Sequence, residues 1–218
     1  MRQEGGNLAG RLRRLGAEFL AQNRFPILLA SLFLAVGIGC GAWGATGIGP
    51  NEANYLNQYV ETIFSHLRPD GTDILAGVKM AFEANGLVIL GIYLCGLTVI
   101  GIPVIAGLLF VRGFALGFTA GFMIAQKGWP GILLAAAALL PQNLILAPVL
   151  VIASAVAACF ATTLTRRIFN PQVALAAGFI RYTWSMTVMA LAALAGGFVE
   201  VFITPELLAA TLTLLNAR

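Results

Sequence analysis

Few residues in this chain could carry acid–base, nucleophilic or metal chemistry. His66 is the only histidine, and no aspartate or glutamate occurs between Ala84 and Val199. The cysteines lie singly within apolar runs, at Cys40, Cys95 and Cys159. A metal site, or a nucleophile with its base, needs several such groups together. We therefore expect a protein that is not an enzyme, with no catalytic residues, metal site or cofactor, and with reduced core cysteines.

Two neighbouring amides, Gln142 and Asn143, follow Pro141 within a long apolar run. Burying an amide costs free energy unless it is hydrogen-bonded. The pair could line a path for a substrate or lipid, or it could form hydrogen bonds between helices that fix a turn. We favour the structural role, and the functional role stays open.

The composition indicates a protein whose solvent is mostly lipid. The chain is 59% hydrophobic and 10% charged, and its mean hydropathy is +0.89. The apolar runs are continuous rather than alternating, and backbone groups in hydrocarbon must be hydrogen-bonded internally, so the spans should be helices. The basic residues cluster at the expected membrane edges, which argues against nucleic-acid binding. We predict an all-α polytopic bundle with about five transmembrane helices.

The charge distribution predicts the domains and the topology. Residues 1–24 form a basic amphipathic segment, which either lies on the cytoplasmic membrane face or only holds the N-terminus inside. A single membrane domain covers residues 25–205, and residues 206–218 form a C-terminal tail. The acidic segment 47–83 should be extracytoplasmic by the positive-inside rule. Five crossings then leave the C-terminus outside the cell membrane.

An amphipathic helical hairpin is expected outside the membrane, over residues 51–83. Apolar residues from Leu56 to Leu67 recur at helical spacing, and Pro69 and Gly71 separate this stripe from a second short helix. The stripe should pack on the bundle or on lipid. The polar face would then be available to a partner protein, with candidate contact residues Asn54, Tyr55, Gln58 and Glu61.

Glycine and proline spacing predicts how the spans pack and bend. A second span over residues 86–110 should kink at Gly101 and Pro103, with Arg112 at the cytoplasmic boundary. A glycine follows at every fourth position, at Gly113, Gly117 and Gly121. This ridge allows close helix packing, either within one chain or across a homodimer.

The apolar stretch from residue 128 to residue 165 is too long for one crossing, since a span takes about 20 residues. We expect it to break at Pro141. Residues 131–141 would form a re-entrant half-helix, residues 144–165 a full span, and residues 182–203 the last span.

Three segments together resemble the stage II sporulation protein M family. They are GLTVIGIP at residues 96–103, FVRGFALGFTAGF at residues 110–122, and LPQNLILAP at residues 140–148, which ends at Pro148. The resemblance extends from about Phe25 to the last span.

The resemblance implies a non-enzymatic scaffold in the cell membrane. Such a protein would recruit two peptidoglycan-degrading enzymes, stage II sporulation proteins D and P, to the septal membrane during engulfment of the forespore. The alternative is a transporter, channel or lipid-handling protein that uses the segment from Pro141 to Asn143. Membrane lipid is an expected partner in both cases.

Overall fold

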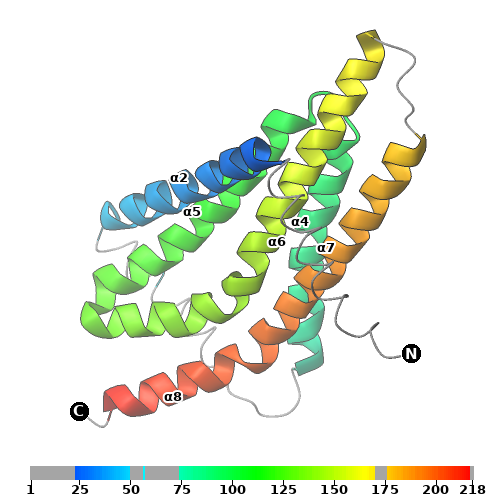
Figure 1. The fold of residues 1–218 in the computed structure, drawn as a ribbon. Coiled ribbons are helices and arrows are strands. Elements are labelled where there is room, and N and C mark those ends of the chain that lie inside the picture. Colours follow the sequence, from blue (N-terminus) through cyan, green and yellow to red (C-terminus); the bar gives the residue numbers. More distant parts are fainter. Residues whose placement is uncertain (1–22, 50–55, 57–73, 170–175, 217–218) are drawn as a thin grey trace, which may run out of the picture.

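The computed structural model describes residues 23–49, 56, 74–169 and 176–216. These residues form a bundle of long apolar helices (Figure 1), and the described part of the chain contains no strand. Its helices are α2 (Arg24–Thr46), α4 (Ile74–Gly96), α5 (Gly101–Lys127), α6 (Trp129–Phe169), α7 (Ala176–Phe202) and α8 (Thr204–Asn216). Five candidate spans are long and apolar enough to cross a membrane. The prediction of an all-α polytopic bundle with five spans is confirmed.

The bundle has two distinct ends. In Figure 1 the α4–α5 turn, the end of α6 and the start of α7 lie toward the upper right, whereas the α5–α6 turn and α8 lie at the lower left. The helix termini at the first end carry Arg166, Arg167 and Arg181. The other end carries Lys127 and Glu206. Of these residues, those at the first end are all basic, whereas the second end carries one basic and one acidic residue.

Helices α2 and α5 meet backbone to backbone through glycines. Gly37 and Gly41 of α2 face the backbone carbonyls of Phe110 and Phe114, where a methyl group would clash. On α5, Gly113 and Gly117 face the carbonyls of Leu34 and Ile38 in the same way, and a Cβ at Gly121 would lie 2.9 Å from the Cα of Ala42. The glycine ridge is thus covered by α2 of the same chain, so it does not offer a contact to a second copy.

The predicted second span over residues 86–110 is wrong, because two helices share that stretch. Helix α4 ends at Gly96, and α5 begins at Gly101 after a short turn. A Cβ at Gly101 would strike the carbonyl of Cys95, so the turn requires glycine there. Pro103 lies in the first turn of α5, where its missing N–H has no intrahelical acceptor anyway. The glycine and proline mark a helix start and not a kink.

The predicted break at Pro141 is also wrong. Helix α6 runs without interruption for 41 residues, with Pro141 and Pro148 inside it. Figure 1 shows that α6 first runs across the lower left of the bundle, above α8, and then turns upward, so it bends instead of ending. Asn143 donates its side-chain N–H to the carbonyl of Leu139 at 2.7 Å. The carbonyl that loses its helical donor at Pro141 is that of Ala137, so this bond does not replace it. Prolines are tolerated in membrane helices because neighbouring helices and local adjustments of the backbone accommodate the freed carbonyl. The arm before Pro141 belongs to one bent helix and is not a separate re-entrant element.

The buried core lies where α4, α5, α6 and α7 meet. Ile92, Leu109 and Leu146 are almost completely buried there. Toward the α4–α5 turn, the ring of Tyr182 stacks between Phe160 at 4.4 Å and Tyr93 at 5.3 Å. The Tyr182 hydroxyl donates to the Tyr93 carbonyl at 2.8 Å, so this buried phenol has its partner.

Two sequence predictions fall partly or wholly outside the described residues. Most of the expected hairpin over 51–83 is among them, including Asn54, Tyr55, Gln58 and Glu61, and so is the amphipathic segment before Asn23. Residues 74–83, expected as the second hairpin helix, are the first turns of α4. Most of the predicted tail over 206–218 belongs to α8, which packs against α6.

Candidate functional site: a polar cluster joining four helices

Four polar side chains meet within the apolar bundle, and each comes from a different helix. They are Asn85 of α4, Arg112 of α5, Gln142 of α6 and Glu200 of α7. Arg112 lies about 16 Å from the start of α5, at about 1.5 Å rise per residue. Ionisable residues at such positions are costly in hydrocarbon, so they usually face partners within the bundle. This polar cluster is the candidate functional site.

The first contact joins α4 to α5. Arg112 donates from Nη2 to Oδ1 of Asn85 at 3.4 Å. Asn85 is 3% exposed, and its helix places it one turn from the buried Ala81 and Ile89. Gly197 of α7 packs against Asn85 and Ala81, where a Cβ would lie 3.4 Å from Asn85 Nδ2. A methyl group at Gly197 would therefore make an ordinary van der Waals contact with the amide.

The second contact joins α6 to α7. The side-chain amide of Gln142 is assigned with its nitrogen toward Glu200, because the opposite assignment would place its oxygen against the carboxylate. In this assignment the nitrogen donates to the Glu200 carboxylate, at 2.5 Å from Oε2 and 3.1 Å from Oε1. Gly196 of α7 lies beside Gln142, and a Cβ there would be 3.8 Å from the Gln142 carbonyl oxygen. A hydrogen bond to a charged acceptor is stronger than one between neutral groups.

The two contacts are linked by charge. The guanidinium of Arg112 and the carboxylate of Glu200 attract each other, and Asn85 lies close to both groups. Opposite charges that are taken out of water together compensate part of their desolvation. The cluster therefore connects α4, α5, α6 and α7 in one electrostatic network.

Two donors in the cluster make no well-aligned hydrogen bond to a described protein group, although Asn85 lies close to the Glu200 carboxylate. They are Asn85 Nδ2 and Arg112 Nε, and both atoms are buried. A partly satisfied network depends strongly on each remaining acceptor. Glu200 is the only carboxylate in the cluster, so its loss would leave the Arg112 charge without compensation.

The structure revises the sequence predictions for these residues. Arg112 was expected at the cytoplasmic boundary, and this prediction is wrong because α5 starts at Gly101 and places Arg112 near its middle. Gln142 does form the predicted hydrogen bond between helices. Asn143 bonds within its own helix instead. Asn85 and Glu200 were not predicted, although a lone acid within the last apolar run is itself a signal.

The other predicted motif residues have structural positions. Gly101 and Pro103 start α5, while Gly113, Gly117 and Gly121 lie against α2. Pro148 lies on α6 with its side chain exposed. All three cysteines are free thiols, and Cys159 donates to Asn23 Oδ1 at 3.0 Å. Among the described residues, no three His, Cys, Asp or Glu side chains lie close enough together to hold a metal ion.

The family described as stage II sporulation protein M matches residues 30–205. The chain belongs to the stage II sporulation protein M family. The matched region contains the whole polar cluster and both sides of the α2–α5 glycine contact. No curated protein and no solved structure matches the chain. This family member is therefore a multi-pass membrane protein of a sporulation family.

Proposed function

We propose that this protein is a non-enzymatic membrane scaffold that recruits and positions peptidoglycan hydrolases at the septal membrane during engulfment. The hydrolases would be stage II sporulation proteins D and P. The observation that carries the proposal is the family match over residues 30–205, which covers the five spans almost completely. The polar cluster supports it, because a scaffold needs fixed helices and the cluster links four of them.

The orientation belongs to the same proposal. The helix termini at the α4–α5 end of the bundle carry arginines from α2, α6 and α7 and no acid. The positive-inside rule assigns this end to the cytoplasm. The N-terminus would then be cytoplasmic, and α8 would lie toward the cell wall.

The proposed contact for the hydrolases is the segment between α2 and α4, residues 47–73. It is the longest stretch of chain between two described helices, and it joins the end of α2 to the start of α4, at the end of the bundle assigned to the wall side. The hydrolases act on the cell wall, so the scaffold must contact them on the wall side of the membrane. Within the segment we keep Asn54, Tyr55, Gln58 and Glu61 as the proposed contact residues.

Site-specific photocrosslinking in the native membrane tests this contact. A photoreactive amino acid at Tyr55 or Gln58 should capture a wall hydrolase, whereas the same group at Thr98, in the α4–α5 turn, should not. Glu61→Lys should weaken the capture. The matched control Lys127→Glu, which reverses an exposed charge at the same end of the bundle, should leave it unchanged. Capture from Thr98 alone, or from none of these positions, would contradict the proposal.

One observation favours the alternative, a transporter. Glu200 and Arg112 place opposite charges within the spans, and such residues also mark ion and substrate pathways. A transporter would need Glu200 as a group that binds and releases its ion or proton. Glu200→Gln would then abolish function without unfolding the bundle, whereas a scaffold should lose function only as far as it loses stability.

A further inference from the structure

Two exposed arginines, Arg24 of α2 and Arg166 of α6, flank the contact between these helices at the α4–α5 end of the bundle. The contact includes the hydrogen bond from Cys159 Sγ to Asn23 Oδ1 at 3.0 Å, and Arg24 directly follows Asn23. Arg166 comes seven residues after Cys159, so it lies on the same face of α6, two turns and about 10 Å further along the helix. Both arginines end in a charged group on a long side chain, so the two groups can reach one ligand at this α2–α6 junction.

The α2–α6 junction is positively charged within the described part of the chain. Neither of its arginines forms an ion pair with another described residue. The described acids are Glu83, Glu200 and Glu206, and they lie toward the other end of the bundle. Glu83 follows Phe82, whose ring meets that of Phe198 near the end of α7. A ligand that complements the junction should therefore be anionic.

The hydrogen-bond donors that this junction offers to a ligand are its guanidinium groups. Thr162 and Thr163 both donate their hydroxyls to the Cys159 carbonyl, at 2.8 Å and 2.9 Å. Thr165 donates to the Ala161 carbonyl at 3.0 Å in the same way. The planar fork of N–H groups on arginine matches the oxygens of a phosphate and can donate two hydrogen bonds to it. A phosphate group is therefore the anion that fits best.

The position of the junction indicates where the phosphate comes from. The first candidate span begins at Arg24, and the span of α6 ends at Arg167. Charged groups are costly in hydrocarbon, so these span ends should lie among the lipid headgroups. Next to Arg24, Phe25 is 73% exposed, and Leu28 and Leu32 continue this exposed apolar face along α2. A molecule with an anionic head and apolar tails fits this order of groups.

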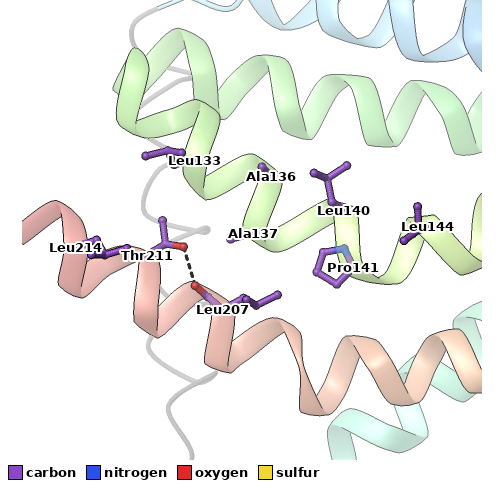
Figure 2. A pocket seen from close by; sticks show the side chains of 9 residues that line it. All are labelled: Leu133, Ala136, Ala137, Leu140, Pro141, Leu144, Leu207, Thr211 and Leu214. Carbon is purple, nitrogen blue, oxygen red and sulfur yellow. Dashed lines mark hydrogen bonds between the residues drawn. The ribbon is translucent and has the colours of Figure 1, made fainter.

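The groove between the first arm of α6 and α8 has a different lining (Figure 2). Eight of its nine lining residues are apolar, and Thr211 is the exception. Figure 2 shows that the Thr211 hydroxyl donates to the Leu207 carbonyl, at 2.7 Å. No residue that lines this groove carries a charge. Complementarity to an anionic headgroup therefore belongs to the α2–α6 junction and not to this groove.

We propose that Arg24 and Arg166 bind the phosphate of one anionic phospholipid at the α2–α6 junction, with its acyl chains along the exposed apolar face of α2. Basic pockets between membrane helices bind anionic headgroups in this way. The bound lipid joins α2 to α6 beside the hydrogen bond between Cys159 and Asn23. The inference rests on the charge and exposure of the junction and does not require the proposed function.

The test measures lipid binding to the full chain in mild detergent by native mass spectrometry. Phosphatidylglycerol is titrated in one series, and phosphatidylcholine, which has a phosphate but no net charge, in the other. We expect phosphatidylglycerol to bind at least about fivefold more tightly. Arg24→Gln and Arg166→Gln should each weaken its binding by about fivefold, because each removes one positive charge beside the headgroup.

Arg181→Gln and Lys127→Gln are the matched controls, since each removes one exposed positive charge. Arg181 lies at the same end but on α7, which meets α6 through the ring of Phe160. At about 0.15 M salt, exposed charges more than about 8 Å apart are largely screened, so each control should change the affinity by less than about twofold. Thermal unfolding without lipid shows whether each variant is folded, and Arg166→Gln alone decides the comparison if Arg24→Gln unfolds the protein.

Three results would overturn the proposal. Equal binding of the two lipids would show that the headgroup charge is not recognised. A loss of affinity in Arg181→Gln equal to that in Arg166→Gln would show a diffuse field of the basic end and not a site. Displacement of the lipid by excess inorganic phosphate would show that a soluble phosphate is the ligand.

Discussion

At the scale of single residues, the polar cluster determines how the bundle tolerates substitution. Arg112 and Glu200 compensate each other's charge inside the spans, with Asn85 and Gln142 as hydrogen-bond partners. Removing one member leaves the other charge uncompensated, whereas removing both restores neutrality. The cluster should therefore behave as one coupled unit.

Arg112→Met and Glu200→Leu should each lower the free energy of unfolding by about 1–3 kcal/mol, because each change leaves partly buried polar partners unsatisfied. The double variant should lose clearly less than the sum, with a coupling free energy of at least about 1 kcal/mol. Reversible unfolding in mild detergent gives these values. The control pair is Lys79 and Glu83, which are 3.9 Å apart and 75% and 61% exposed. Its coupling should stay below about 0.5 kcal/mol, and equal coupling for both pairs would refute the account of the cluster.

The sequence shows the two charged members of the cluster, but it does not show that they lie close together in the fold. Arg112 and Glu200 are each conspicuous in apolar surroundings, yet they lie far apart in the chain. Their pairing depends on where α5 begins, and that boundary was placed wrongly. Asn85 gives no signal of its own, because it becomes buried only through the packing of α4 on α7.

At the scale of elements, glycine spacing on α5 predicts a packing face, and the structure shows that α2 covers it. The matching glycines on α2 were recognisable as well. The sequence does not show that the α5 ridge packs against α2. A ridge of small residues fits a helix of the same chain and a helix of another copy equally well. A homodimer stays a prediction, and it would have to use another surface.

Gly37→Ala should destabilise the bundle by about 1–3 kcal/mol, since the new methyl group meets the Phe110 carbonyl across the α2–α5 contact. Gly39→Ala, on the same helix, meets nothing within 4 Å. It should be neutral or stabilise the helix by up to about 1 kcal/mol. Melting temperatures in detergent test the pair of variants. Equal effects would mean that α2 does not pack on α5 in this register.

Helix boundaries were the least predictable elements. Pro103 and Pro141 look alike in the sequence, as prolines within apolar runs. The first lies in the opening turn of α5, and the second lies inside α6. The two prolines differ in whether the backbone before them is helical. The tight turn at Gly101 ends the helix before Pro103, whereas α6 continues through Pro141.

At the scale of the whole molecule, the arrangement of basic termini predicts the orientation in the membrane. In a variant without native cysteines, Thr98→Cys at the α4–α5 turn should be protected from an impermeant thiol reagent in intact cells. Lys127→Cys at the opposite end should react readily. Permeabilised cells should label at both positions. The reverse pattern in intact cells would invert the topology and remove residues 47–73 from the wall side.

If the protein is a scaffold, hydrolase recruitment depends on the bundle that the polar cluster stabilises. Exchanging the two charges of the cluster tests this dependence most directly. Stage II sporulation proteins D and P are quantified after purification of the chain from its native membrane, for the wild type, Arg112→Glu, Glu200→Arg and the double swap. Both amides can present either a donor or an acceptor, so the swap can rebuild the network. We predict that each single variant loses bundle stability and hydrolase recovery together, and that the double swap restores both. Absence of the hydrolases from the wild-type sample, or full recovery with an unfolded single variant, would contradict the account.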